Sequence, residues 1–343
     1  MTIAVYIPSY NQKAYLRQAI DSVLAQTRPA DQIIVVDDAS TDGSQDLIRG
    51  YASRYPSLFT MVFHHRNRGI AATRNDALEA VRCDLVTYVD GDDIIEPRKL
   101  AWESDMLDRS TRAQIVFSNH GYMSGEGRRR HRVWAKTEQP PQGDVFVDTV
   151  TRRYPENTLF RNELLPVQCL RKVHGFDSSL SMYEDYDLRI RLTKRYRTAY
   201  CPEVNGWVRE HSGPRLSKSS CEEHFRNVLR IAEKNRPLWS DLPEDQARRI
   251  EAGLDAFLAK LARRSAMQLT DQGQRARARA ARREARRRGA CPLQLAMDLL
   301  LSTLPEWGRE DILPVVKGNL RRGRGVVGRA LRGVRRRREE GGT

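Results

Sequence analysis

The chain has 343 residues, more than a single domain usually contains, so we expect one large domain with an appended region, or two domains. Its 40% apolar and 30% charged residues are ordinary for a globular protein, but the formal net charge is +15, and most of that excess lies in residues 221–343. The five cysteines are scattered and never form a C-x-x-C pair, which argues against a disulfide framework and a zinc knuckle and fits a reducing compartment.

Residues 1–120 alternate apolar runs with amphipathic segments. Short apolar runs typical of buried strands occupy residues 3–7, 33–36, 60–63 and 85–89. Between them, apolar side chains at helical spacing begin at Leu16, Leu47 and Ile70. This alternation predicts an α/β fold with a doubly wound, mostly parallel sheet and helices on both faces.

Polar side chains follow three of these expected strands. They are Ser9-Tyr10-Asn11, Asp37-Asp38-Ala39-Ser40 and Asp90-Gly91-Asp92-Asp93. Ligands of such sheets bind beyond the carboxyl ends of the strands, so we expect the three segments to line one crevice. The sequence has no G-x-G-x-x-G after the first strand and no G-x-x-x-x-G-K-[ST] segment, which excludes the dinucleotide fingerprint and the P-loop.

The acidic segment at residues 90–93 has the residue types of a metal site. Asp90 and Asp92 place two carboxylates on one turn, and Mg²⁺ and Mn²⁺ prefer such oxygen ligands while keeping positions for phosphate oxygens. The alternative is a polar turn that caps a helix beginning near Pro97. The pattern alone fits both a metal site and a capped turn, so the choice between them depends on the residues of the neighbouring segments.

The segments around Asp38 and Arg74 offer groups that recognise a nucleotide. In a pocket, the Asp38 carboxylate can accept the N3–H of uracil while Tyr10 stacks on the base. Asn67 and Arg74 bring amide and guanidinium donors to the start of a helix, where they can meet a diphosphate or hold the acidic segment. A capped strand-to-helix turn and exposed helix charge are the alternatives.

Two later segments carry groups suited to group transfer. Glu184 and Asp185 lie near the first turn of an amphipathic helix, and a carboxylate there can take a proton from an acceptor hydroxyl. Arg209 and His211 can bring donors to a pyrophosphate leaving group. Acids at helix starts and single histidines are also common without any catalytic role, and this alternative stays open.

Seven segments in fixed order resemble one known family. They are IPSYNQ, LAQT, IIVVDDASTDGS, NRGIAATRN, YVDGDD, HGFDSSLSMYEDYDLRIRL and VREHSGPRLS. Together they resemble the inverting family 2 glycosyltransferases with the GT-A fold, over roughly residues 3–219. The resemblance implies a donor-nucleotide site formed by Pro8, Tyr10, Asn11, Asp38, Asn67, Arg74 and Asp90. It also implies that Asp92 and Asp90 are metal ligands. Asp185 is the implied general base, with Glu184 beside it, and Arg209 and His211 are implied to lie near the donor phosphates.

The implied reaction is a metal-dependent transfer with inversion of configuration. Asp185 takes the proton of an acceptor hydroxyl as that oxygen attacks the anomeric carbon, and Mn²⁺ or Mg²⁺ at Asp92 neutralises the departing diphosphate. The expected donor is a UDP-linked sugar, with dTDP- and GDP-sugars as alternatives, and the expected acceptor is a hydroxyl of a glycan or lipid-linked glycan. An inactive transferase-like adaptor for membranes or nucleic acid, and a nucleotidyltransferase, are the rival functions.

A change in composition divides the chain at residue 220. We expect residues 1–220 to form the transferase domain, with a nucleotide-sugar half at 1–120 and an acceptor half at 121–220. The acceptor half includes the basic stretch Ser124–Arg132. Residues 221–343 are expected to form a basic helical region.

The basic region has the composition of a segment that lies on a membrane surface. Arg275–Arg288 is helix-prone, and Asn319–Arg338 interleaves apolar residues with arginines, as a helix on an anionic bilayer does. A solvated tail is the alternative, and nucleic acid is the less favoured partner. The N-terminus lacks a signal-peptide pattern, and no apolar stretch reaches the roughly 20 residues that cross a bilayer. We therefore expect a cytoplasmic protein at the inner face of the plasma membrane.

Overall fold

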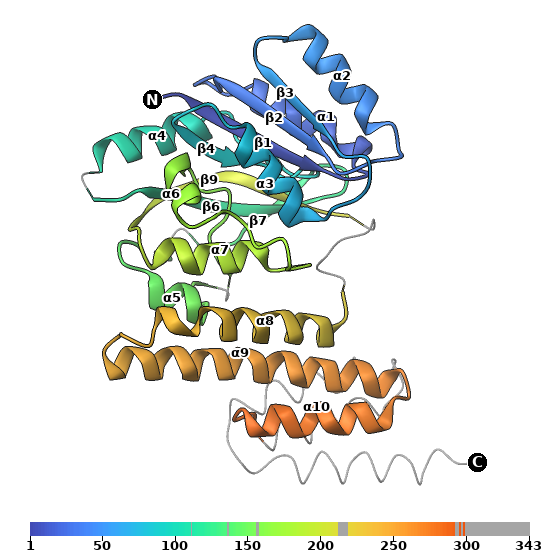
Figure 1. Ribbon diagram of the computed structural model, residues 1–343, viewed down its shortest axis with the longest axis vertical. Coiled ribbons are helices and arrows are strands. Elements are labelled where there is room, and N and C mark those ends of the chain that lie inside the picture. The colour runs from blue at the N-terminus through green and yellow to red at the C-terminus, as the bar shows by residue number, and fades with distance from the viewer. Residues whose placement is uncertain are drawn as a thin grey trace. The chain divides into compact units, whose positions relative to one another are not determined.

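The computed structural model describes residues 1–291 except 111, 136, 156–157 and 212–218, together with Leu295 and Asp298. The chain divides into two compact units, Met1–Leu258 and Ala259–Thr343. Within the described residues, every strand belongs to the first unit (Figure 1). The candidate site is therefore built from the first unit.

A five-stranded sheet forms the first part of this unit (Figure 1). Its strands are β1 (Ile3–Ser9), β2 (Gln32–Asp37), β3 (Phe59–Phe63), β4 (Leu85–Tyr88) and β8 (Leu165–Pro166). Their order is β3-β2-β1-β4-β8, and all neighbours are parallel except β8, which is antiparallel to β4. The predicted α/β fold with a mostly parallel sheet is confirmed.

Helices cover both faces of this sheet because its strands are apolar on both sides. The helices of this region are α1 (Lys13–Leu24), α2 (Ser44–Arg54), α3 (Ile70–Ala80) and α4 (Lys99–Arg109). In β1, Ile3, Val5 and Ile7 pack in one core with side chains of α1, α2 and α4. The alternate residues Ala4 and Tyr6 pack in another core with side chains of α3. Burial on both faces explains the continuous apolar run of this strand.

A second sheet has four strands and follows the acidic segment. The strands are β5 (Ile94–Ile95), β6 (Ile115–Ser124), β7 (Arg129–Arg132) and β9 (Thr198–Glu210), in the order β5-β9-β6-β7. β6 and β9 are parallel, whereas β5 pairs with β9, and β7 with β6, in antiparallel fashion. Between β7 and β9 the chain forms α5 (Phe146–Thr151), α6 (Val167–Lys172) and α7 (Glu184–Thr193). Residues 90–93 thus join β4 of the first sheet to β5 of the second.

Helices make up most of the described chain after residue 220. They are α8 (Cys221–Asn235), η3 (Arg236–Leu238), α9 (Glu244–Asp271) and α10 (Arg275–Arg287). Val228 and Ile231 of α8 are fully buried, and Asn235 donates to Asp187 Oδ1 of α7 at 2.8 Å. The first compact unit includes α8 and runs to Leu258, and the division at residue 220 stays a prediction from composition.

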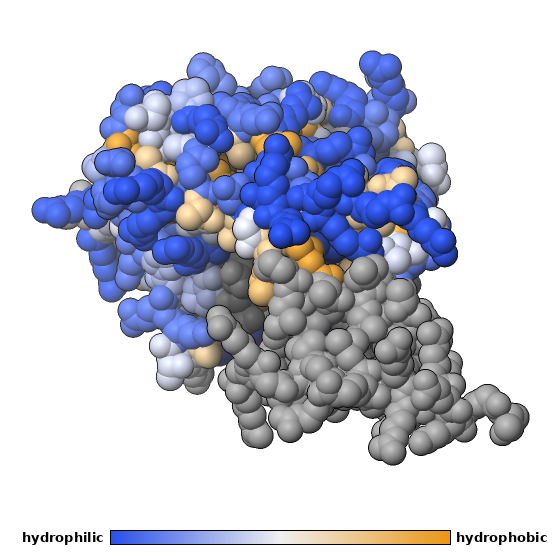
Figure 2. Space-filling view, turned by 90° about the horizontal axis from the view of Figure 1, so that it is seen from below, coloured by the Kyte–Doolittle hydropathy of each residue, from blue (hydrophilic) through white to orange (hydrophobic). Residues whose placement is uncertain are grey.

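The basic segment at Arg275–Arg288 is helical as predicted, since α10 spans Arg275–Arg287. Arg282 of α10 donates to Thr270 Oγ1 at 2.6 Å. The predicted basic helix at Asn319–Arg338 lies outside the described residues. Among the helices that the structure describes, none combines the length and apolar character needed to cross a membrane. The described residues visible in Figure 2 are mostly hydrophilic.

Candidate active site

The carboxyl ends of β1, β2 and β4 lie side by side at one edge of the first sheet. Parallel pairing places Ser9 of β1 opposite Asp37 of β2. Beyond the strands, the Asp38 N–H donates to the Ser9 carbonyl at 2.9 Å, and the Gly91 N–H donates to the Pro8 carbonyl at 3.2 Å. Backbone hydrogen bonds therefore bring together the three polar segments that follow these strands.

The segment after β1 exposes an aromatic ring. Tyr10 is 48% exposed, whereas Pro8 is buried within β1. Asn11 has a φ of 51°, accepts the Thr41 N–H on Oδ1 at 2.8 Å, and donates its own N–H to Ser40 Oγ at 2.8 Å. Asn11 therefore ties the loop after β1 to the loop after β2, and the Tyr10 ring stays accessible to a planar ligand.

Asp38 is buried and held by the loop between β3 and α3. Its Oδ1 accepts the Arg68 N–H at 2.7 Å and lies 2.6 Å from His64 Nδ1, while its Oδ2 accepts the Gly69 N–H at 2.8 Å. Asn67 is exposed in the same loop. Because each carboxylate oxygen has two acceptor positions, one position on Oδ2 remains for a further donor.

Arg74 of α3 joins the acidic segment to α7. Its Nη2 donates to Asp90 Oδ1 at 2.8 Å, and its Nη1 lies 3.5 Å from Glu184 Oε1. The guanidinium is buried and lies over the Tyr88 ring, 4.7 Å from the ring centroid. Two acidic segments that are far apart in the sequence therefore meet at one buried cation.

A second arginine holds the other side of the acidic segment. Arg161 Nη2 donates to Asp90 Oδ2 at 2.9 Å and lies 3.4 Å from Asp93 Oδ2. Both Asp90 oxygens are thus bonded to guanidinium groups, and each keeps a second acceptor position for a ligand. Burial raises the pKa of Asp93 to about 8, against the opposing charge of Arg161.

Asp92 is the carboxylate of this segment that faces a histidine. Its Oδ2 lies 3.0 Å from His211 Nε2, and the His211 ring lies against Tyr15 with the ring centroids 4.8 Å apart. In the part of the chain that the structure describes, no group of three or more His, Cys, Asp and Glu side chains is arranged to hold a metal. Asp92 offers one carboxylate to a cation such as Mg²⁺, whose other ligands are commonly phosphate oxygens and water, and the His211 imidazole lies beside that carboxylate.

Arg209, expected near the donor phosphates, lies beside the acidic segment. It is fully buried in β9, where its backbone N–H donates to Asp93 Oδ1 and its Nε donates to the Asp92 carbonyl, each at 2.8 Å. Its Nη1 and Nη2 donate to the Gly125 carbonyl and to Gln18 Oε1. Three guanidinium N–H groups thus have protein acceptors, so Arg209 holds the backbone of the acidic segment in place.

The neighbouring carboxylates at the start of α7 have different surroundings. The Glu184 side chain is 7% exposed, and burial raises its pKa to about 7, against the charge of Arg74. The Asp185 side chain is 38% exposed and pairs with Arg189, one turn along the helix. Burial raises the pKa of Asp185, but the charges of Arg189 and then Arg74 bring it below its usual range. Asp185 is the accessible, ionised carboxylate of the two.

Three charged residues around the acidic segment and α7 received no role from the sequence. Arg189 is almost fully buried, and its Nη2 donates to Tyr88 Oη at 3.0 Å and to Glu163 Oε2 at 3.1 Å. Its spacing of four residues from Asp185 on a helix is a local signal that could have identified it. Arg161 and Glu163 have no such signal, because their partners lie in distant segments.

Comparison with known sequences places this arrangement in a family. Residues 4–167 match the sequence model described as Glycosyl transferase family 2. An uncharacterized protein of Mycobacterium tuberculosis is 30% identical over 211 residues, which cover 60% of this chain and 57% of that protein. An uncharacterized glycosyltransferase of Nostoc sp. is 39% identical over 100 residues, which cover 29% of this chain and 31% of that protein. The chain thus spans little more than half the length of the mycobacterial relative.

Solved structures share the fold. TarS residues 1–349 from S. aureus, in complex with UDP, align with a TM-score of 0.59 and 17% identity, over 84% of this chain and 89% of that chain. The mannosyltransferase PcManGT from Pyrobaculum calidifontis, in complex with GDP-Man and Mn²⁺, aligns with a TM-score of 0.55 and 19% identity, over 88% and 80%. At these identities the likeness concerns the fold alone. Residues 4–167 are therefore identified with glycosyltransferase family 2, within a chain that has the GT-A fold.

Proposed function

We propose that this protein is a metal-dependent, inverting glycosyltransferase that moves a sugar from a UDP-linked donor to a hydroxyl of a glycan or lipid-linked glycan. The observation that carries the proposal is the position of Arg74, which contacts Asp90 at the strand ends and Glu184 beside Asp185. Transfer requires a leaving-group site and a base within reach of one reacting carbon. The buried arginine brings together the two acidic segments that supply them.

The donor nucleotide fits the edge formed by the strand ends. The half-exposed Tyr10 offers a stacking surface beside the buried Pro8, and the remaining acceptor position of Asp38 matches a single base N–H, such as uracil N3–H. We assign Asp90 to the ribose side and the exposed Asn67 to the mouth of this site. The complexes of TarS with UDP and of PcManGT with GDP-Man support a nucleotide sugar as the class of donor.

Asp185 is the proposed general base. Its carboxylate takes the proton of the acceptor hydroxyl while that oxygen bonds to the anomeric carbon, and the bond from this carbon to the diphosphate oxygen breaks on the opposite face, so that configuration inverts. Arg209 and Arg161 hold the acidic segment in place during the reaction. A Mn²⁺ or Mg²⁺ ion held by Asp92 and His211 would supply positive charge to the leaving diphosphate.

We further assign residues 1–120 to the donor half and residues 121–220 to the acceptor half of the transferase. We propose that the basic region after residue 220 associates with the anionic inner face of the plasma membrane. Most arginines of α10 are exposed and therefore available for such contact. Co-sedimentation with vesicles tests this assignment: we expect binding to phosphatidylglycerol vesicles and much less to phosphatidylcholine vesicles, and equal binding to both would contradict it.

Release of UDP tests the reaction class. The full chain is incubated with UDP-, dTDP- and GDP-sugars with and without Mn²⁺, and the nucleotide product is measured. We expect Mn²⁺-dependent release of a nucleoside diphosphate, which Asp92→Asn lowers about 100-fold or more. Asp105→Asn, which removes an exposed carboxylate on α4, should leave the rate unchanged.

Two other outcomes identify the rival functions. Release of pyrophosphate from a sugar phosphate and a nucleoside triphosphate would identify a nucleotidyltransferase. An adaptor without activity would consume no donor. Nucleotide sugars would also leave its melting temperature unchanged, since only a ligand that binds the folded protein raises that temperature. Either result would overturn the proposed transfer.

A further inference from the structure

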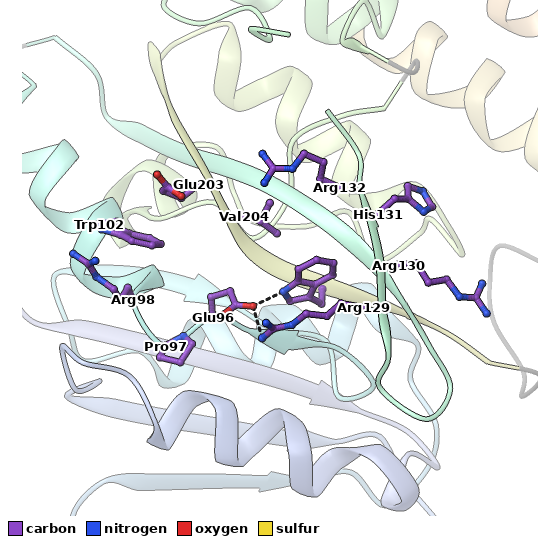
Figure 3. Close-up of a pocket in the computed structure, with 11 residues that line it drawn as sticks. Glu96, Pro97, Arg98, Trp102, Arg129, Arg130, His131, Arg132, Glu203 and Val204 are labelled. Atoms are coloured by element: carbon purple, nitrogen blue, oxygen red, sulfur yellow. Dashed lines mark hydrogen bonds and ion pairs between the residues drawn. The ribbon is translucent and has the colours of Figure 1, made fainter. Parts of the chain in front are cut away.

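A groove separate from the strand-end residues lies over the second sheet (Figure 3). It encloses about 770 Å³, and its lining comes from the segment between β5 and α4, from Trp102 of α4, from β7 and from β9. None of the residues assigned above to the donor, the metal or the base is part of this lining. The basic stretch Ser124–Arg132, which the proposed reaction does not use, supplies one wall through β7.

Arginines dominate the charge of this groove. Four arginines and two glutamates line it, namely Arg98, Arg129, Arg130, Arg132, Glu96 and Glu203. The side chains of Arg129 and Arg130 are 55% and 53% exposed. Arg129 pairs with Glu96 at 2.6 Å, whereas Arg98 and Arg132 have no carboxylate partner among the described residues. The groove therefore presents a moderate excess of positive charge to solvent.

Two tryptophans form apolar surfaces in the same groove. Trp207 of β9 donates its indole N–H to Glu96, and the Arg129 guanidinium lies 5.2 Å from the Trp207 ring centroid. The Arg98 guanidinium lies over Trp102 of α4, with its Cζ 4.4 Å from the ring centroid. Both tryptophans are partly exposed, so each offers an indole face beside a guanidinium group.

A glycine fixes the position of the Trp207 ring. Gly121 of β6 lies opposite Trp207 in the sheet register. A Cβ atom at position 121 would lie 2.5 Å from a carbon of the indole ring and 2.8 Å from the His131 carbonyl oxygen. The missing side chain therefore lets the indole lie across β6 toward β7, where it becomes a fixed surface of the groove.

We propose that this groove binds an anionic glycan, as the part of the acceptor chain that carries carboxylate or phosphate groups. The proposal rests on the proposed glycosyl transfer and names the chemical class of its acceptor. Guanidinium groups bind carboxylates and phosphates through paired hydrogen bonds, and an indole face packs on the apolar face of a sugar ring. The two glutamates limit the positive charge, and the indole faces match sugar rings, so the groove suits a charged glycan better than a nucleic acid.

Binding of defined oligosaccharides to the full chain tests this inference. The probes are oligogalacturonate, which carries a carboxylate on each sugar, and an uncharged maltooligosaccharide of the same length, and binding is followed by tryptophan fluorescence and calorimetry. We expect oligogalacturonate to bind at least about tenfold more tightly than the maltooligosaccharide. The double substitution Arg129→Gln with Arg132→Gln should weaken oligogalacturonate binding by about tenfold or more.

Arg128→Gln is the control, because it removes one arginine charge from an 83% exposed side chain of the same stretch that does not line the groove. It should leave binding unchanged, and equal losses in Arg128→Gln and the double variant would overturn the inference. Equal affinity for the two oligosaccharides would overturn it too, as would tighter binding of oligothymidylate or phosphatidylglycerol vesicles through the same two arginines. UDP release is measured on the wild type in parallel. Its absence would refute the proposed transfer, while the oligosaccharide binding result still decides the groove.

Discussion

Arginines gather both in the strand-end cluster, formed by Arg74, Arg161 and Arg189 with their carboxylate partners, and in the groove over the second sheet. The two sets of arginines differ in their burial. In the cluster, the side chains of Arg74 and Arg189 are 6% and 2% exposed and are bonded to carboxylates. In the groove, Arg129 and Arg130 are more than half exposed. Buried charges must be paired, so the cluster has a fixed geometry before a ligand arrives, whereas exposed arginines can adjust to one. The first arrangement suits chemistry, and the second suits binding.

The largest effect on activity should come from the accessible carboxylate of α7. Asp185→Asn removes the proposed base and should lower kcat by about 10²- to 10⁴-fold, with a smaller change in the KM for the donor. Steady-state rates of UDP release measure both constants, and the melting temperature confirms that the variant is folded. Near-normal turnover in Asp185→Asn, together with a large loss in Glu184→Gln, would move the base to Glu184.

Removal of one buried arginine should reveal how much stability depends on the pairing within the cluster. Arg74→Gln leaves Asp90 and Glu184 without their shared cation, so we expect the free energy of unfolding to fall by about 3–5 kcal/mol. Arg130→Gln removes a groove arginine whose surface partner is Glu210, and it should lower the free energy of unfolding by about 1 kcal/mol or less. Urea denaturation measures both. Similar losses in the two variants would erase the distinction between cluster and groove.

The protonation of Glu184 should make stability depend on pH. Burial raises its pKa from 4.5 to about 7, so the folded chain keeps a proton that the unfolded chain has lost between these values. The contribution of Glu184 to the free energy of unfolding therefore falls as pH rises through this window. The free energy of unfolding of Glu184→Gln should therefore rise relative to that of the wild type as pH rises. For Glu79→Gln, at an exposed position of α3, the difference in this free energy from the wild type should stay constant with pH. A constant difference for Glu184→Gln would contradict its burial as a proton-binding group.

A smaller effect is expected where the site is open. Tyr10→Ala removes the proposed stacking surface and should raise the KM for the donor roughly tenfold with little change in kcat, because stacking on a base contributes about 1–3 kcal/mol. Tyr55→Ala is the control, since Tyr55 is 39% exposed and belongs to none of the assigned sites. A loss confined to kcat would place Tyr10 outside the donor site.

The strands and helices of the first sheet could be predicted because each has a local pattern of apolar residues in the sequence. Residues such as Val5 and Tyr6 alternate between two cores, which gives an unbroken apolar run, and Leu16 and Ile20 show the spacing of a helix that covers one face. The second sheet has no comparable signal. Its strands bury polar residues such as Asn119 and Asn205, and Asn205 Nδ2 finds its partner, Ser118 Oγ, only through pairing between distant segments.

The same contrast explains which site residues could be identified. Asp38, Asp90 and Asp92 follow predicted strands, and parallel strands end at one edge, so their proximity could be predicted from the sequence. Arg161 could not be found, because it reaches Asp90 from a loop without periodicity. The contacts of Arg209 could not be predicted for a related reason: its sequence context gives no sign of the four protein groups that accept its hydrogens.

The position of a bound cation tests the central claim most directly. A crystal grown with UDP and Mn²⁺ shows the metal through its anomalous scattering, independently of any activity. The account predicts one Mn²⁺ at coordinating distance from Asp92 and His211, bridged to the diphosphate, with the uracil ring against Tyr10. Mn²⁺ and UDP bound elsewhere on the chain, or UDP bound at the strand ends with Mn²⁺ absent from Asp92, would contradict it.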